Sequence, residues 1–250
     1  MPEDDAPDRK TPTRGSPLFA ISRSPLCSRR MTMKLHNYFR SSASYRVRIA
    51  LALKGLTYEY APVHLVRGEH LKAPFASIST DMLLPLLEVE NGDSGDTERF
   101  SQSMAIIEYL DEMHPQPPLL PPDPAGRAHV RALAQTIACE IHPVNNLRVL
   151  KYLVRDLKLD DAVKTAWYRH WVREGLQAFE RQLAQRPPSL YCHGDTLTLA
   201  DCCLVPQIFN AQRFDCDLGE LPRTMAAYEA AMQVDAVQQA HPSRCPDAEA

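Results

Sequence analysis

The pattern of hydrophobic and polar positions divides the 250-residue chain into two parts. Four short segments of the first part have the pattern of β-strands: 34–39, 57–65, 86–90 and 98–100. Two segments repeat apolar residues at helical spacing, 45–54 and 103–114, and the polar segment 68–77 is compatible with a further helix. The Asn-Gly pair between the last two strands is typical of a hairpin. We therefore predict a small mixed sheet with helices on its faces.

A proline-rich segment, PQPPLLPPDP at 115–124, separates this part from the second one. Its six prolines exclude a helix and favour a stiff, extended linker. Beyond it the pattern is helical, over 125–155, 160–185, 199–213 and 222–234. We predict an α/β domain at 33–115, a linker at 116–124 and an all-α domain at 125–250.

Composition narrows the possible functions. Residues 1–32 are rich in proline, serine, aspartate and arginine and lack a hydrophobic period, so we predict a disordered extension. The net charge of -3 gives no basis for binding nucleic acid or an anionic membrane, and no apolar run could span a bilayer. Seven cysteines without a CxxC pair, and nine histidines without zinc-site spacing, indicate reduced thiols, a cytoplasmic protein and no metal site.

Candidate chemistry lies in YFRSSASYRVRIAL, residues 38–51, where Ser41, Ser42 and Ser44 precede or open a helix. Serine is a preferred helix N-cap, so these residues could serve only as caps. Alternatively, the unpaired N–H groups and partial positive charge of the helix start hold an anion. The two interpretations are compatible with each other, and the pattern by itself favours capping.

Several motifs are similar to those of zeta-class glutathione transferases: SSASYRVRIALALKG, QSMAIIEYLDE, HPVNNLRVLKY, YCHGDTLTLADCCLVPQ, AQRFDCDL and HPSRCPD. The resemblance runs from about Met33 to Asp247. It implies a thioredoxin-like N-terminal domain, an all-helical C-terminal domain and a homodimer. In this assembly we expect a cis peptide bond before Pro85, at the start of the third strand.

The resemblance implies a glutathione site, in which a helix start lowers the pKa of the bound thiol. Ser42, with Ser41 as the second candidate, is expected to donate a hydrogen bond to the glutathione sulfur. Arg213 is expected to bind a substrate carboxylate, although a surface ion pair is the commoner fate of a lone arginine. The remaining residues implied in binding glutathione or lining its site are Ser44, Leu84, Pro85, Gln102, Ser103, His142, Asn146 and Leu147.

The implied activity is isomerisation of a cis double bond conjugated to carbonyl groups, with glutathione as a cofactor that returns unchanged. The small-molecule substrate is a maleyl keto acid: maleylacetoacetate, which gives fumarylacetoacetate in tyrosine and phenylalanine breakdown, or maleylpyruvate from gentisate. Zeta-class members act on both, and the motifs favour maleylacetoacetate by a small margin. A fold does not establish a function, so a binding protein without catalysis and a transferase acting on halogenated acids are the other hypotheses.

Other positions qualify this picture. Ala43 stands where many zeta members have cysteine, so redox activity that uses that thiol should be weak or absent. STDMLLP at 79–85 replaces a common Asn-Pro pattern, which puts glutathione affinity in doubt but not the fold. Arg40, Arg46 and Arg48 are interpreted as surface residues, one of which could face the site. We expect Thr198 and Asp201 to form a structural capping box, and Trp167 and Trp171 to lie in the core or an interface.

Overall fold

The computed structural model describes residues 32–92 and 95–249. Of the predicted extension, residues 1–31 lie outside the described residues, and Thr32 opens the first strand. The four strands are β1 (Thr32–Asn37), β2 (Glu59–Pro62), β3 (Leu86–Glu90) and β4 (Thr97–Ser101). They form one sheet in the order β2-β1-β3-β4, in which β1 and β2 are parallel and the other neighbours antiparallel. The predicted mixed sheet and hairpin are present.

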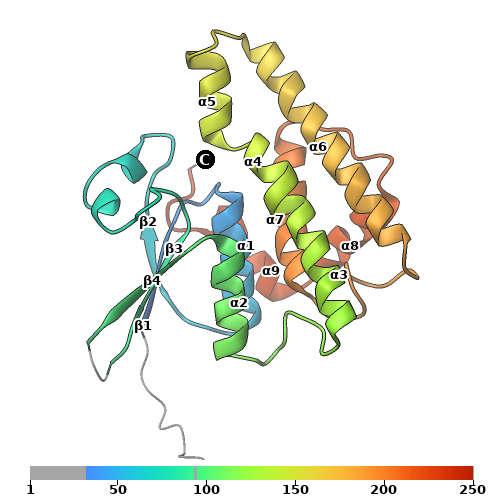
Figure 1. The fold of residues 1–250 in the computed structure, drawn as a ribbon, viewed down its shortest axis with the longest axis horizontal. Coiled ribbons are helices and arrows are strands. Elements are labelled where there is room, and N and C mark those ends of the chain that lie inside the picture. Colours follow the sequence, from blue (N-terminus) through green and yellow to red (C-terminus); the bar gives the residue numbers. More distant parts are fainter. Residues whose placement is uncertain (1–31, 93–94, 250) are drawn as a thin grey trace, which may run out of the picture.

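Two helices lie between this sheet and the helical domain (Figure 1), α1 (Ser42–Leu53) and α2 (Ser103–Met113). Their apolar side chains join Leu35 and Leu87 of the sheet in the main core. The polar segment at 68–77 does not form a regular helix. It contains two single 3-10 turns, η1 (Glu69–Leu71) and η2 (Phe75–Ser77), because Pro74 interrupts it. The Leu84–Pro85 peptide bond, which opens β3, is cis as predicted.

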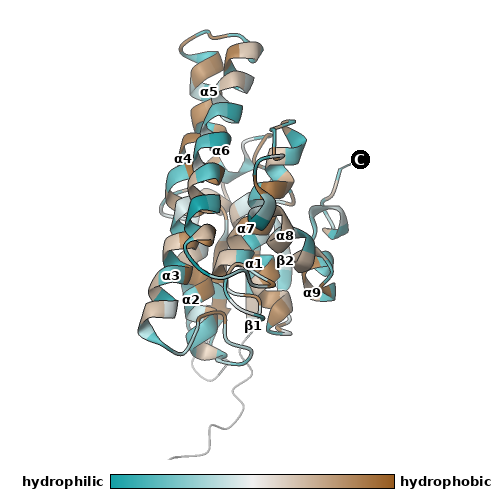
Figure 2. Cartoon of the chain, turned by 90° about the vertical axis from the view of Figure 1, so that its right-hand side faces the viewer, coloured by the Kyte–Doolittle hydropathy of each residue, from teal (hydrophilic) through white to brown (hydrophobic). Residues whose placement is uncertain are grey.

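The second domain is helical throughout. Its helices are α3 (Pro124–Gln135), the π-helical η3 (Thr136–Ile141), α4 (His142–Val144), α5 (Leu147–Arg155), α6 (Asp161–Ala184), α7 (Leu199–Arg213), α8 (Pro222–Met232), α9 (Asp235–Gln239) and the 3-10 turn η4 (Pro242–Arg244). Figure 2 shows hydrophilic and hydrophobic residues alternating along the outer helices, whereas α7 is mostly buried. The predicted fold class, an α/β domain followed by an all-α domain, is therefore confirmed.

The segment predicted to be helical over 125–155 is divided into several helices. The chain passes through a π-helical turn and a single turn of α4 before it breaks at Asn145. Pro143 supplies no backbone N–H, and Asn146 takes an extended conformation in which its side chain accepts a hydrogen bond from Arg148 N and caps α5. The break turns α5 toward the first domain, and the side chains around it face the site described below.

A buried lysine fixes the linker to α1. The Lys54 side chain is 0% exposed, and its Nζ donates to Asp111 Oδ1 at 2.7 Å and to the carbonyls of His114 and Pro117. Asp111 Oδ1 also accepts from Leu119 N at 2.9 Å. The end of α1, the end of α2 and the linker are thus joined at one point.

The predicted capping box stabilises the start of α7. Asp201 Oδ2 accepts from Thr198 N at 2.8 Å, and its Oδ1 accepts from Cys192 N. Burial raises the pKa of this carboxyl group. The structural capping box predicted for Thr198 and Asp201 is therefore present.

Candidate active site

A cavity of about 650 Å³ lies where the first domain meets α4, α5 and α7. The first domain contributes the loop after β1, the segment around η1 and the residues before Pro85. The second domain contributes the break between α4 and α5 and the C-terminal half of α7. Helices that carry the two halves of the cavity pack directly on each other, since α1 contacts α7.

The two serines before and at the start of α1 have different roles. Ser41 is the N-cap, with extended backbone, and its Oγ accepts a hydrogen bond from Ser44 N at 3.2 Å. Ser42 is the first helical residue and lines the cavity although it is only 6% exposed. The first N–H groups of a helix have no acceptor within it, so the cavity meets the positive end of α1. Capping and a polarised helix start therefore coexist.

A chain of hydrogen bonds from α7 orients Ser42. Arg213 Nη1 donates to Asn210 Oδ1 at 3.0 Å, and Asn210 Nδ2 donates to Ser42 Oγ. Because the oxygen of Ser42 already accepts, its hydroxyl hydrogen remains available to donate into the cavity. Burial lowers the pKa of Arg213, with the charge of Arg40 as a second cause, and arginine remains charged in proteins.

A second serine has the same arrangement at the start of α2. Ser103 is 5% exposed, and its Oγ accepts a hydrogen bond from Arg46 Nη1 at 3.2 Å. The hydroxyl hydrogen of Ser103 is again free to donate elsewhere. Gln102, which precedes it with a positive φ of 67°, is exposed and donates through Nε2 to Asp81 Oδ2 at 3.3 Å.

His142 faces the cavity from α4. Its Nε2 lies 3.4 Å from Asn146 Nδ2. Burial, followed by the positive charges of Arg46 and Arg148, lowers the pKa of His142 to about 3. The imidazole is therefore neutral near pH 7 and keeps one nitrogen as a donor and one as an acceptor.

The structure brings together most of the predicted site residues, but not all of them. Those that line the cavity are Ser41, Ser42, Leu84, His142, Asn146, Leu147 and Arg213. Those that do not are Ser44, Pro85, Gln102 and Ser103. Ser44 is fully buried in α1 and its Oγ has no partner among the described residues. Gln102 reaches the cavity only through Asp81, a lining residue.

Several lining residues were not predicted, most clearly Asn210, Gln207 and Asp81. Gln207, Asn210 and Arg213 are spaced three residues apart on α7, so they share one face. Polar residues at this spacing within the apolar sequence of α7 are a signal that sequence reasoning could have used.

The expectation for the arginines of α1 is wrong. Arg46 and Arg48 are each 2% exposed, so neither forms a surface ion pair. Arg40 is exposed and lines the cavity. Trp167 is partly buried against the core, as predicted, and its Nε1 donates to the Val144 carbonyl, but Trp171 is 37% exposed.

Comparison with known proteins identifies the family. Residues 35–118 match the glutathione S-transferase N-terminal domain and residues 161–232 the C-terminal domain. The chain is 46% identical to a maleylpyruvate isomerase of a Ralstonia species, over 86% of this chain and 99% of the relative. It resembles the holo structure of a maleyl pyruvate isomerase described as a bacterial zeta-class enzyme, with 44% identity, a TM-score of 0.81 and coverage of 86% and 100% of the two chains. The chain belongs to the zeta class of the glutathione S-transferase family.

A second solved relative of this transferase carries ligands. It is the maleylacetoacetate isomerase of Anaeromyxobacter dehalogenans with bound dicarboxyethyl glutathione and citrate in its active site. The two proteins are 42% identical with a TM-score of 0.80, over 89% of this chain and all of the other. The family predicted from the motifs is thus confirmed.

The transferase organises its unusual 79–85 segment around Asp81. Asp81 Oδ1 accepts from Ser79 Oγ at 3.1 Å and from Leu83 N at 3.0 Å, while Oδ2 accepts from Gln102. One carboxylate therefore holds the segment that leads to Leu84 and ties it to the start of α2.

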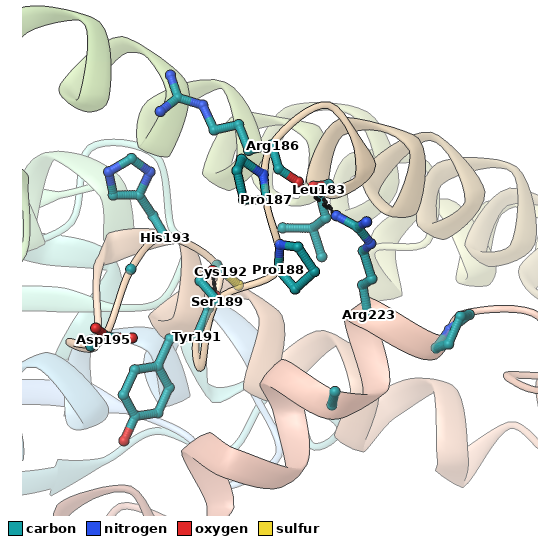
Figure 3. Close-up of a pocket in the computed structure, with 13 residues that line it drawn as sticks. Leu183, Arg186, Pro187, Pro188, Ser189, Tyr191, Cys192, His193, Asp195 and Arg223 are labelled. Atoms are coloured by element: carbon teal, nitrogen blue, oxygen red, sulfur yellow. Dashed lines mark hydrogen bonds between the residues drawn. The ribbon is translucent and has the colours of Figure 1, made fainter.

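A second cavity of the transferase, of about 530 Å³, lies between the end of α6 and the start of α8 (Figure 3). Arg223 Nη1 donates there to the carbonyls of Leu183 and Arg186, so this guanidinium closes the C-terminal end of α6. No residue of the first domain lines this cavity, and it does not contact the serines of α1 and α2. It is therefore separate from the candidate active site.

Among the described residues of the transferase, no helix is both long and apolar enough to cross a membrane. These residues also include no group of three or more His, Cys, Asp or Glu side chains placed to hold a metal ion.

Proposed function

We propose that this transferase is a glutathione-dependent isomerase that converts maleylacetoacetate to fumarylacetoacetate. The observation that carries the proposal is Ser42, a buried hydroxyl at the positive end of α1 whose oxygen is occupied by Asn210 and whose hydrogen can therefore donate to an anion. Bound glutathione supplies a thiolate that adds reversibly to the maleyl double bond and so allows rotation about it. Ser42 and the start of α1 hold the sulfur in its anionic form.

The residues present fit glutathione. The tripeptide carries two carboxylates and a thiol, and the chain offers donors for each kind of group in one region. Buried donor atoms without a partner among the described residues include Arg46 Nε, Arg46 Nη2 and Gln207 Nε2. Ser103, at the start of α2, is proposed to bind the γ-glutamyl end together with Gln102. The backbone of Leu84, before the cis bond to Pro85, is proposed to pair with the cysteinyl unit.

The substrate is proposed to bind on the side of α5 and α7. Arg213 and Arg40 are proposed to hold the carboxylate beside the reacting carbons, since a guanidinium fork suits a carboxylate. Arg148 and Lys151 of α5 line the same cavity and add positive charge for a substrate with two carboxylates. The neutral imidazole of His142 can donate or accept a hydrogen bond without adding charge.

The relatives support this class of reaction. A dicarboxyethyl group is what a thiol forms when it adds across the double bond of a butenedioic acid, and the Anaeromyxobacter isomerase binds glutathione in that form. Relatives named for maleylpyruvate and for maleylacetoacetate are of nearly equal identity, 44% and 42% among the solved structures. The substrates differ by one methylene, and maleylpyruvate remains the alternative.

The deciding experiment follows the loss of each cis substrate by ultraviolet absorbance, with and without glutathione, and couples the trans product to its hydrolase. We expect glutathione-dependent turnover of maleylacetoacetate above that of maleylpyruvate. Ser42→Ala should lower kcat/KM by about two orders of magnitude, because the charge on the sulfur loses its donor. Ser189→Ala, an exposed serine beside the second cavity, should leave it unchanged.

The opposite outcome is also informative. If neither substrate turns over and Ser42→Ala behaves as the wild type does, the isomerase proposal is wrong and a binding protein of this fold remains. We further propose that the transferase is a cytoplasmic homodimer, as the family resemblance implies. Light scattering coupled to size-exclusion chromatography should give twice the mass of the chain.

A further inference from the structure

Arg46 is a buried cation that the described part of the chain does not neutralise. Its side chain is 2% exposed, yet it makes one hydrogen bond, from Nη1 to Ser103 Oγ at 3.2 Å. Among the described residues, Nε and Nη2 have no hydrogen-bond partner, and no carboxylate lies within ion-pair distance. A buried charge without partners is strongly unfavourable in a folded protein.

The neighbours of Arg46 do not offset its charge. The titratable groups that face it are the thiols of Cys203 on α7 and Cys139 on η3, and the imidazole of His142 on α4. Burial raises the pKa of Cys203 to about 11, so this thiol is neutral at pH 7. His142 is neutral as well, and Arg148 is a further positive charge that acts on it. The region is therefore electropositive.

The position of Arg46 links it to both proposed contacts of glutathione. It lies four residues after Ser42 on α1, so the two side chains are one helical turn apart on one face, about 6 Å along the axis. Through its hydrogen bond it also polarises Ser103, whose hydrogen stays free to donate. An anion at either serine would interact with this charge across a region of low dielectric.

We propose that Arg46 is a positioning residue whose buried positive charge has bound glutathione as its counter-ion. The inference rests on the proposed glutathione site. Arg46 does not touch the sulfur. It acts through Ser103, whose hydroxyl it turns toward the γ-glutamyl carboxylate, and through the field that it exerts on the thiolate beside Ser42. Without glutathione the cation destabilises the protein, and with glutathione it strengthens binding.

This role predicts that removal of the Arg46 charge does not lower the stability of the protein without glutathione, but weakens the stabilisation that glutathione provides. In Arg46→Met, an unbranched side chain fills the space and the buried charge is gone. We expect the melting temperature without glutathione to stay the same or to rise by a few degrees. The upward shift that saturating glutathione causes should become smaller than in the wild type. If Arg46 were merely structural, Arg46→Met should greatly lower the melting temperature without glutathione and leave the shift caused by glutathione unchanged.

Two further variants make the test specific. Arg48→Met removes an equally buried arginine of α1 whose three guanidinium nitrogens each have a hydrogen-bond partner, so it should lower the melting temperature without glutathione. Arg46→Lys keeps the charge and should retain most of the glutathione shift. Arg223→Met, beside the second cavity, should leave the glutathione shift unaltered.

The second readout is the thiolate absorbance near 240 nm of bound glutathione, titrated with pH. Removing a nearby positive charge disfavours the anion, so Arg46→Met should raise the thiol pKa by about one unit, a tenfold loss of thiolate at neutral pH. Arg46→Lys should bring the thiol pKa back toward the wild-type value. In Arg46→Met, the KM for glutathione should rise by a larger factor than kcat falls.

Two results would overturn the inference. In the first, Arg46→Met lowers the melting temperature as much as Arg48→Met does and leaves the thiol pKa unchanged, so Arg46 is structural. In the second, glutathione does not stabilise the wild type at all, which removes the proposed glutathione site as well. Because both measurements use glutathione without substrate, failure of the isomerase assay alone would leave this inference standing.

Discussion

The two faces of α1 bury arginines in contrasting ways. On the face toward the loop after β1, Arg48 donates to Asn37 Oδ1 at 3.1 Å, to the Phe39 carbonyl at 3.0 Å and to the Ala240 carbonyl at 3.1 Å. On the face toward α2 and the helical domain, Arg46 has Ser103 as its one hydrogen-bond partner among the described residues. The two side chains are equally buried.

The difference teaches that burial by itself does not tell whether a charged residue serves stability or function. Arg48 ties the N-terminal domain to α9, because Ala240 follows that helix directly. Its partners are carbonyl oxygens that would lack donors without it. Arg46 leaves donor capacity unused on α1 four residues after Ser42, which lines the cavity, and this is the condition expected of a residue that awaits a ligand.

Arg48→Met is expected to have the largest effect on stability. It leaves two buried carbonyls and the Asn37 amide oxygen without their donor, which should lower the free energy of unfolding by about 3–5 kcal/mol. Urea denaturation of the protein without glutathione measures it. Arg67→Met is the control, because Arg67 is 66% exposed and its pair with Glu249 should contribute less than about 1 kcal/mol. Equal losses in the two variants would contradict the structural role of Arg48.

Lys54→Met extends the contrast to a third buried cation of α1. The variant removes an ammonium that holds Asp111 and the carbonyls of His114 and Pro117, so we expect a loss of about 2–4 kcal/mol in the free energy of unfolding. The double variant Lys54→Met with Asp111→Leu should recover part of that loss, because the carboxylate is no longer left buried without its partner. A double variant whose losses simply add would exclude this coupling.

The fold was largely predictable, because strand and helix periodicity matches the binary pattern. The predicted strand at 86–90 coincides with β3, and the helix at 199–213 coincides with α7. The helical pattern over 125–155 does not reveal the break between α4 and α5, where a proline and two asparagines lie between apolar residues that keep helical spacing. There, local backbone chemistry outweighs the pattern.

The site was predictable only where a motif carried it. Ser42, Leu84, His142 and Arg213 line one cavity as the resemblance implies. The burial of Arg46 and Arg48 could not be derived, because arginine is mostly exposed and the partners that make burial possible are distant in sequence. Arg48, for example, reaches the Ala240 carbonyl, 192 positions further along the chain.

The pH dependence of stability tests whether Arg46 keeps His142 neutral. Its folded-state pKa is lowered to about 3 from 6.5, by burial first and Arg46 second. The unfolded chain therefore binds the proton more readily, and this contribution to stability is present above pH 6.5 and is lost as the pH falls from there toward 3. From pH 7 to 5 the wild type should lose about 1–2 kcal/mol through this group.

The measurement compares the urea stability of wild type and His142→Gln at both pH values. Between pH 7 and 5, the free energy of unfolding of His142→Gln should fall by about 1–2 kcal/mol less than that of the wild type. The loss in Arg46→Met should lie between the two, because the imidazole then protonates at a higher pH. The same pH dependence in wild type and His142→Gln would show that His142 is not held neutral.

Substitution of Asn210, on α7, should have the smallest effect. It tests the orientation of Ser42, the first residue of α1. Asn210→Ala removes the donor to Ser42 Oγ and the acceptor of Arg213, so Ser42 loses its orientation but keeps its hydroxyl. One net hydrogen bond of about 1 kcal/mol corresponds to roughly a fivefold loss in kcat/KM. Asn210→Asp should lose more, at least tenfold, because a carboxylate accepts the Ser42 hydrogen instead of donating and places negative charge beside the sulfur. Gln212→Ala, an exposed residue of the same helix, is the control. If Asn210→Asp retains the activity of Asn210→Ala, the direction of the Ser42 hydrogen does not matter, and the parallel between Ser42 and Ser103 fails with it.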